Sequence, residues 1–346
     1  MLGSRGIPAR YGGFEAVAWS LAEHLPKASN TGLYVACESS LKSSRPNLFM
    51  VRTIYFPLVE RARVVSEVLY DAISLVWCSF RSDVRVIYLL GYSASPFCII
   101  PRAFGKKVII NVDGLEWKRR KWNKPARIAL KILEHIAHYT ANVKAFDSKT
   151  VQAIHERMYG RHPSIFVPHF IDKYELGRPT GDYLVVARLE PENNLLKIIS
   201  AFKASGSKKR LIIVGDSGNR AYKRRLIDSV RSSERISLQG SVYGEAVRDL
   251  RRSCFAYIHG HEVGGTNPSL LEAMSFGNLI FAKDTSYNRE VLESSGQFWE
   301  SPEALARLIR QIETSNDAKI YRERAYQRAK DYDIEKVMKT YVEAFS

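Results

Sequence analysis

The sequence is poor in cysteine, has no long apolar run and has few acidic residues for its many basic ones. Its four cysteines are widely separated and lie in apolar stretches, which is typical of buried free thiols in a reducing compartment. The best candidate for a membrane span, residues 69–80, contains Asp71 and falls short of the roughly 18 apolar residues that a span requires. The beginning of the chain lacks the pattern of a signal peptide. We therefore expect a cytoplasmic protein without a disulfide framework.

The net charge of +16 is concentrated in the first half of the chain. Residues 1–165 carry 24 Lys and Arg against 12 Asp and Glu, whereas the remainder carries 28 against 24. Such a one-sided positive domain suits an anionic membrane surface, a phosphate-bearing substrate or nucleic acid, and a generally basic proteome is the plainer interpretation. Because the chain has no recognisable nucleic-acid reading module, no nucleic-acid partner is expected.

The order of apolar segments predicts two α/β domains, each with a parallel sheet covered by helices. Short runs rich in Val, Ile and Tyr alternate with segments of helical period. The strands expected in the first half are 33–37, 51–56, 86–90, 107–112, 143–146 and 165–167, with helices at 15–25, 62–80 and 125–139. Those expected in the second half are 183–187, 210–214, 236–238, 254–259 and 279–282, with helices at 195–204, 220–231, 245–252 and 268–276.

A short polar stretch with two prolines separates the two repeats of this pattern. We expect a Rossmann-like domain over 1–167, a hinge over 168–180 and a second Rossmann-like domain over 181–325. The closing segment, 326–346, is expected to return to the first domain as a helix. Only Met1 and Leu2 precede the first glycine turn, so the first strand is expected to be truncated.

Two segments of the first half follow expected strand ends. Residues 3–15 hold four glycines and the arginines Arg5 and Arg10 before a helix, which suits an anionic ligand, although a structural loop is an alternative. After strand 107–112, Asp113 and Glu116 are placed to hold sugar hydroxyls or to accept a proton. Two tryptophans among four cations at 117–122 suit an interface or a lipid phosphate, and a solvated basic face is the alternative.

The second half carries a second anion-binding pattern. Arg188 follows the first strand of this half, and its forked guanidinium suits a diphosphate. A Gly-Gly-Thr-Asn loop at 264–267 precedes a helix with Pro268 in its first turn. Glu272 lies one turn further on and is expected to face inward toward vicinal hydroxyls. The pair His259 and His261 has no evident third metal ligand, so no metal is expected.

Together these segments resemble the retaining family 4 glycosyltransferases of the GT-B fold, and among them the rhamnosyltransferase-like branch. Five blocks occur in the order of that branch: GSRGIPARYGGFE, NVDGLEWKRRKW, ARLEPENN, GGTNPSLLEAM and YNREV. The resemblance implies two Rossmann-like domains that face each other across a cleft. It also implies a nucleotide sugar held mainly by the second domain and an acceptor approaching from the first.

The resemblance assigns roles to individual residues. Arg188 would neutralise the leaving diphosphate, Asp113 stands where many relatives have a histidine, and Glu262 would contact the transferred sugar. Donor-binding residues would be Asn193, Gly215, Gly240, Val242, Gly264, Gly265, Thr266, Asn267 and Glu272. Acceptor-side residues would be Arg5, Arg10, Gly12, Gly13, Glu116, Trp117 and Lys118. Two positions depart from the broader family, since Gly264 replaces the first of a pair of glutamates and Asn193 replaces a diphosphate-binding lysine.

The function implied by the resemblance is transfer of L-rhamnose from dTDP-L-rhamnose, with retention, to a polyprenyl-diphosphate-linked saccharide. No metal or other cofactor is expected, because Arg188 and backbone donors would stabilise the departing charge. The enzyme would work in surface polysaccharide assembly at the inner face of the plasma membrane. The alternatives are a UDP- or GDP-sugar donor, a non-catalytic sugar-nucleotide-binding homologue, a basic nucleic-acid binder, and a hydrolase or epimerase of similar fold.

Overall fold

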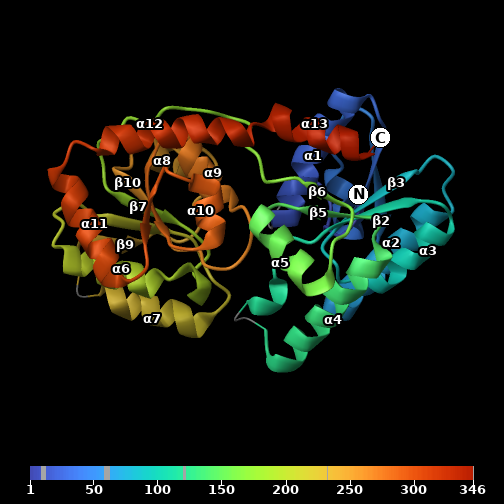
Figure 1. Ribbon diagram of the computed structural model, residues 1–346, viewed down its shortest axis with the longest axis horizontal. Coiled ribbons are helices and arrows are strands. Elements are labelled where there is room, and N and C mark those ends of the chain that lie inside the picture. Colours follow the sequence, from blue (N-terminus) through green and yellow to red (C-terminus); the bar gives the residue numbers. More distant parts are fainter. Residues whose placement is uncertain (9–12, 58–62, 120–121, 232, 346) are drawn as a thin grey trace. The chain divides into compact units, whose positions relative to one another are not determined.

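The computed structural model describes the chain except for residues 9–12, 58–62, 120–121, 232 and 346, and it describes residues 63–65 by their backbone alone. The chain forms two compact units (Figure 1). Unit 1 comprises Met1–Pro168 and Glu335–Ser346, and unit 2 comprises His169–Ile334. The chain therefore passes from one unit to the other twice, at 168/169 and at 334/335.

The segment expected as a hinge is bonded to unit 2 over most of its length. The backbone N–H groups of Glu175 and Gly177 donate to Ser275 and Phe276, and those of Arg178 and Thr180 donate to Arg252 and Ser253. The expected hinge over 168–180 is thus corrected to a passage at 168/169. The returning segment is also shorter than expected, because unit 1 takes only residues 335–346, which include α13 (Ile334–Phe345) apart from its first residue.

Unit 1 is built on parallel strands. β1 (Leu33–Glu38) pairs with β2 (Val51–Phe56), and a second sheet has the order β3 (Val86–Leu90), β4 (Lys107–Asn111), β5 (Val143–Phe146) and β6 (Ser164–Phe166). The first residues connect the two sheets, because Leu2 forms a parallel bridge with Leu89 while the Ala36 N–H donates to the Met1 carbonyl at 3.1 Å. The expected short first strand is therefore a single bridging pair between β1 and β3.

Helices follow the strands of unit 1. They are α1 (Gly13–Ser29), α2 (Arg63–Ser79), α3 (Ile99–Ala103), α4 (Lys124–Thr140) and α5 (Lys149–Tyr159). The last helix, α13, packs on the sheet that contains β3, because the rings of Tyr341 in α13 and Tyr88 in β3 meet edge to face with 5.7 Å between their centres. None of the described helices has both the length and the apolarity needed to cross a membrane.

Unit 2 holds one parallel sheet with helices on both faces. Its strand order is β12 (Gln297–Trp299), β11 (Leu279–Lys283), β10 (Ala256–His259), β7 (Tyr183–Val186), β8 (Leu211–Val214) and β9 (Ile236–Leu238). The helices are α6 (Leu195–Ser205), α7 (Arg220–Val230), α8 (Glu245–Ser253), α9 (Pro268–Ser275), α10 (Ser286–Leu292), α11 (Pro302–Thr314) and α12 (Ala318–Ala329).

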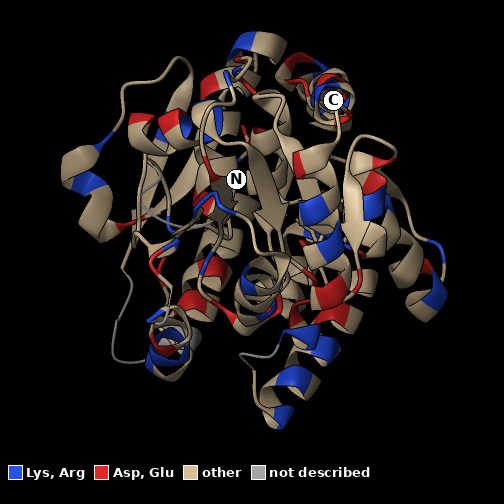
Figure 2. Ribbon diagram, turned by 90° about the vertical axis from the view of Figure 1, so that its left-hand side faces the viewer, with Lys and Arg blue, Asp and Glu red and all other residues tan. Residues whose placement is uncertain are grey.

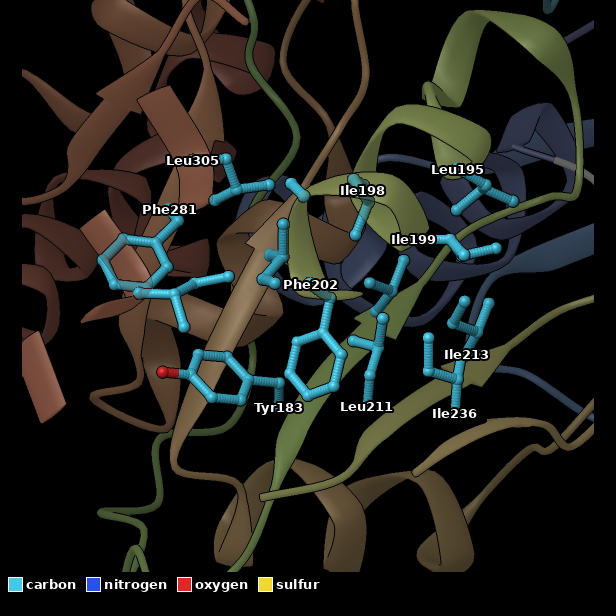
Figure 3. Packing of buried hydrophobic residues seen from close by; sticks show 14 of the residues in the cluster. Tyr183, Leu195, Ile198, Ile199, Phe202, Leu211, Ile213, Ile236, Phe281 and Leu305 are labelled. Carbon is cyan, nitrogen blue, oxygen red and sulfur yellow. The ribbon is translucent and has the colours of Figure 1, made fainter. Parts of the chain in front are cut away.

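Alternation along the strands of unit 2 produces two buried clusters. Tyr183 and Phe281 point to the face covered by α6, α7 and α11, where Tyr183 meets Phe202 with 5.5 Å between ring centres (Figure 3). Their neighbours Leu184 and Ile280 point to the other face, which is covered by α9, α10 and α12. This period of two is what a sheet with helices on both sides requires.

Each unit has one point at which its strand order reverses. In unit 2 the chain moves outward from β7 through β8 to β9, then crosses back and moves outward through β10, β11 and β12 on the other side. The switch point lies between β7 and β10. In unit 1 it lies between the Met1–Leu2 segment and β3. Ligands of open α/β sheets bind at such points, outside the carboxyl ends of the strands, so the site is sought there.

Candidate functional site

The switch point of unit 2 brings together the loop after β7 and the loop after β10. The Asn194 side chain donates from Nδ2 to the Gly260 carbonyl at 2.9 Å and to Glu262 Oε2 at 3.0 Å. The Glu262 N–H donates in turn to the Glu192 carbonyl at 3.1 Å. The predicted segments 187–194 and 259–267, about 70 residues apart in the chain, therefore form one bonded surface.

Asn193 connects two parts of this surface by hydrogen bonds. Its buried amide donates to the Arg188 carbonyl at 2.7 Å, and its oxygen accepts from His261 Nδ1 at 2.8 Å. Since an amide oxygen only accepts, the His261 ring carries its hydrogen on Nδ1. Each end of the amide makes one hydrogen bond, so the Asn193 side chain holds the backbone of Arg188 and the ring of His261. Its predicted contact with the donor stays a prediction.

Arg188 presents its charge to solvent. The residue is exposed, and its guanidinium makes no hydrogen bond or ion pair with any residue that the structure describes. Arg188 thus has a fixed backbone and a guanidinium that is open to a ligand. This arrangement suits a diphosphate, because two parallel N–H groups of a guanidinium can donate to two phosphate oxygens.

The loop at 264–267 leads into the N-terminus of α9. Asn267 caps the helix by accepting the Ser269 N–H at 2.9 Å, and Pro268 occupies the first turn. Gly264 has φ +138°, and a Cβ at that position would lie 3.0 Å from His261 Nε2. The positive φ favours the glycine that replaces the family's glutamate, and a Cβ there would also press on the His261 ring.

Glu272 does not face inward as expected. Its side chain is 57% exposed, and its Oε2 accepts from Arg251 Nη2 at 2.7 Å. The expectation was wrong because α9 packs its leucines on the sheet and turns this position outward. Arg251, only 1% exposed, also donates to Ser269 Oγ at 2.8 Å and so positions the first turn of α9. No pattern in the sequence distinguishes Arg251 from its neighbour Arg252.

The glycine positions set how closely the loops approach. The Gly215 N–H donates to the Gly240 carbonyl at 2.8 Å, which joins the loops after β8 and β9. Gly215 has φ +146°, and a Cβ there would lie 1.8 Å from the Ala187 carbonyl oxygen. Val242, expected to bind the donor, is half-buried and packs against the cluster under α9. The later YNREV block contacts the loop after β10, because Asn288 Nδ2 donates to the His261 carbonyl at 3.0 Å.

His259 is a core residue next to the site. Its Nε2 is buried without a hydrogen-bond partner among the described residues, and burial lowers the pKa of the ring well below 6.5. The ring is therefore neutral. Within the part of the chain that the structure describes, no group of three or more His, Cys, Asp or Glu is placed to hold a metal.

The switch point of unit 1 is a cavity of about 340 Å³. The loops after the first bridging pair, β3 and β4 line it, together with one side of α2. The predicted residues Arg5, Asp113 and Glu116 are among its lining, as are Ser4, Glu15, Glu38, Glu67, Tyr70, Asp71, Tyr92 and Arg119. Arg10 and Gly12 lie outside the described residues, and Gly13 begins α1.

The cavity is acidic although its unit is basic. Both of its arginines are paired, since Arg5 Nη2 lies 2.8 Å from Glu67 and Arg119 Nε lies 2.7 Å from Glu116. Further carboxylates, including Asp113 with its left-handed φ of +53°, remain in the lining. The described lining favours hydroxyl groups over phosphate. The anionic ligand expected at residues 3–15, of which 9–12 lie outside the described residues, stays a prediction.

Trp117 and Lys118 lie outside this lining. Lys118 Nζ is 5.5 Å from the centre of the Trp117 ring, and Lys131 Nζ of α4 is 5.3 Å from it. The two cations therefore stack on the indole, an arrangement that stabilises the loop before α4. Their predicted contact with the acceptor stays a prediction.

Two buried hydroxyls in the cavity lack partners in the described part of the chain. Ser4 Oγ and Tyr70 OH are both buried, both line the cavity, and neither makes a hydrogen bond. Asp71 lies beside them, accepts the Gly3 N–H at 3.1 Å, and has its pKa raised to about 7 by burial and, less strongly, by the charge of Glu67. Unpaired buried hydroxyls beside a carboxylate are suited to a polyhydroxylated ligand.

We expect the Asp71→Asn variant to gain stability over the wild type as the pH rises. Because the pKa of Asp71 is about 7 in the folded protein and 3.8 as its ordinary value, the folded state binds the proton more tightly. Stability from this site is complete below pH 4 and is lost as the pH rises through 7, whereas asparagine does not titrate. The free energy of unfolding of the variant relative to that of the wild type, measured with urea, should rise by about 3 kcal/mol between pH 5 and pH 8. A relative stability that is the same at both pH values would contradict the raised pKa of Asp71.

The comparisons with known proteins agree with this architecture. Residues 170–332 match the family described as Glycosyl transferases group 1, and residues 1–171 match a domain of unknown function, DUF1972. No curated protein sequence gives a significant match.

Solved glycosyltransferase structures are similar over both units. Sucrose-phosphate synthase from Thermosynechococcus elongatus matches with a TM-score of 0.83 at 14% identity, covering 99% of this chain and 97% of that one. HepE from Anabaena in complex with UDP matches with a TM-score of 0.76 at 14% identity, again covering 99% and 97%. The pneumococcal O-GlcNAc transferase GtfA in complex with UDP and GlcNAc matches with a TM-score of 0.62 at 14% identity, covering 80% of this chain and 59% of that one.

At these identities the structural likeness shows the fold, which is GT-B, and the family match over 170–332 shows a glycosyltransferase domain. The predictions of two Rossmann-like units and of a glycosyltransferase are thus confirmed. The rhamnosyltransferase-like branch stays a prediction.

Proposed function

We propose that the chain transfers a hexose, with retention of configuration, from a nucleotide diphosphate donor to a lipid-linked saccharide in surface polysaccharide synthesis. The observation that carries the proposal is the switch point of unit 2. There the uncommitted guanidinium of Arg188 and the capped N-terminus of α9 border one surface, formed by the bonded loops after β7 and β10. A cation and a helix N-terminus at a switch point together favour a diphosphate.

In this mechanism the protein stabilises the charge that develops as the bond between the sugar and the diphosphate breaks. Arg188 binds the departing phosphate oxygens, and backbone N–H groups at 264–267 add to it. The acceptor hydroxyl attacks from the same face, and the departing diphosphate oxygen takes its proton. No step requires a metal or another cofactor, so a chelator should leave the rate unchanged. Glu262 and Asp113 are proposed to contact the transferred sugar and the acceptor, and Glu272 to bind the ribose.

The acceptor is proposed to place an uncharged sugar in the cavity of unit 1. Paired arginines and an excess of carboxylates disfavour a phosphate there, whereas Ser4, Tyr70 and Asp71 offer three groups for hydroxyls. The diphosphate of a polyprenyl carrier would lie outside this cavity. This division separates recognition of the saccharide from recognition of the lipid.

The donor is proposed to be dTDP-L-rhamnose, on the resemblance of the five sequence blocks. The similar structures of HepE and GtfA are complexes with UDP, which supports a nucleotide diphosphate donor and leaves its base and sugar to experiment. The proposal places the protein on the inner face of the plasma membrane, where lipid-linked acceptors are extended.

The test is a panel of radiolabelled nucleotide sugars, each incubated with the protein and a bacterial membrane lipid extract, with and without a chelator. We expect label to enter the lipid fraction from dTDP-rhamnose and not from UDP-glucose or GDP-mannose, and the product anomer to match the donor. Transfer from a different donor would remove the rhamnose assignment. Donor binding without any transfer would contradict the proposal and favour a non-catalytic binding protein.

A further inference from the structure

Unit 1 exposes an apolar surface that the proposed chemistry does not use. Most of the large apolar side chains exposed by the described residues lie on or directly after α2, α3 and α4. We call this surface the α2–α4 face. Its members are Leu69, Ile73, Val76, Phe80, Ile99, Phe104, Ile128, Ile132 and Tyr139.

The face follows the period of a helix. On α2 and just beyond its end, Leu69, Ile73, Val76 and Phe80 recur at intervals of four, three and four residues, so they form one stripe. Leu75 and Cys78 of the same helix are buried in the unit. The helix therefore has apolar side chains on its solvent side as well as on its core side, an arrangement that marks an interaction surface when the apolar patch is contiguous.

The three helices make the surface continuous. The rings of Phe80 and Phe104 meet edge to face with 4.8 Å between their centres, which joins the end of α2 to the end of α3. Arg102 of α3 donates from Nη1 to the carbonyl of Tyr139 at 2.6 Å, which joins α3 to the end of α4. Figure 1 shows α2, α3 and α4 next to one another within this unit.

Among the described residues around the face, exposed cations outnumber exposed anions. Exposed cations other than Arg81, whose charge is balanced by Asp83, are Arg85, Arg102, Lys124 and Lys131. Acidic residues contribute little, because Asp71 and Glu134 are buried, Glu67 is paired with Arg5, and Asp83 is paired with Arg81. Elsewhere basic and acidic residues interleave along the helices (Figure 2). An apolar stripe bordered by cations matches the interface of an anionic bilayer, where the side chains enter the acyl boundary and the cations meet headgroup phosphates.

We propose that the α2–α4 face docks unit 1 on an anionic lipid bilayer. The inference rests on the proposed function only for its purpose, since a lipid-linked acceptor lies at that surface. Binding itself requires neither donor nor acceptor, so it is measured without turnover.

The test is cosedimentation of the full chain with phosphatidylcholine vesicles, with and without phosphatidylglycerol. The Ile73→Glu/Ile132→Glu double variant is compared with Ile320→Glu, because Ile73 is 48% exposed on α2 and Ile320 is 50% exposed on α12 of unit 2. We expect the wild type and Ile320→Glu to bind the anionic vesicles, and the double variant to bind about tenfold or more weakly. Lys124→Glu, at an exposed position, should weaken binding at least about fivefold. This variant remains informative if the double variant does not fold.

Three results would overturn the proposal. One is a wild type that does not sediment with anionic vesicles, and another is an Ile320→Glu variant that loses as much affinity as the double variant. The third is a dimer seen by light scattering and dissociated by the double substitution, which would make the face a contact between two copies. Vesicle binding without transfer activity would remove the proposed function and retain the face, whereas transfer without vesicle binding would remove the face alone.

Discussion

Replacing Arg188 with alanine is expected to lower the rate of sugar transfer by about 10²–10³-fold, the usual loss when one preorganised donor to a developing oxyanion is removed. The fold should be unaffected, because the guanidinium makes no bond within the described residues and the backbone of Arg188 is held by Asn193. Initial-rate kinetics at saturating acceptor, with the thermal unfolding midpoint beside them, measure both effects.

Arg235→Ala is the matched control for this prediction. Arg235 is also an exposed arginine of unit 2, but it directly precedes β9 and so lies at the amino ends of the strands, opposite the switch point. Its variant should retain the wild-type rate. Equal losses in the two variants would show that general positive charge, and not the position after β7, supports the reaction.

Replacing Gly215 with alanine is expected to destabilise unit 2 by about 3 kcal/mol or more and to abolish donor binding. A left-handed backbone strains any residue with a Cβ, and here the Cβ would lie 1.8 Å from the Ala187 carbonyl, next to Arg188. Relief of that clash requires β7 and β8 to separate at the edge where the site lies. Urea unfolding, followed by calorimetric titration with the nucleotide, measures the two losses.

Gly218→Ala provides the comparison within the same loop. A Cβ at 218 meets nothing within 4 Å, and its backbone is not left-handed. Its stability should stay within about 0.5 kcal/mol of the wild type. If both variants lose stability alike, the close approach at Gly215 is not the cause.

The sequence predicted most of the fold because hydrophobic period and strand length are local signals. Each strand expected from the apolar runs occurs within two residues at either end, and so does helix 268–276. The strand Gln297–Trp299 was missed because three residues between polar neighbours carry too little pattern. The hinge was misplaced for a related reason: polar residues and prolines indicate an irregular segment and do not show whether its backbone is bonded to a unit.

The sequence predicted where the candidate site residues lie in the fold, and less well what their side chains contact. Arg188 and the loop at 264–267 follow strand ends, so topology alone brings them to one edge. The sequence does not show contacts that depend on the tertiary structure. Asn193 bonds to the His261 ring because the fold places the two side by side. Glu272 faces outward and is paired with the buried Arg251. The acidic lining of the cavity in unit 1 was likewise hidden within a basic half, since net charge does not show where each charge lies.

The central claim, that the donor diphosphate binds at the switch point of unit 2, is tested most directly by hydrogen exchange in the presence of dTDP, with UDP as the second nucleotide. The account predicts slowed exchange in peptides covering 187–194 and 260–274, with that protection lost in Arg188→Ala. Nucleotide binding that leaves these peptides unchanged, or protects only peptides of unit 1, would contradict it.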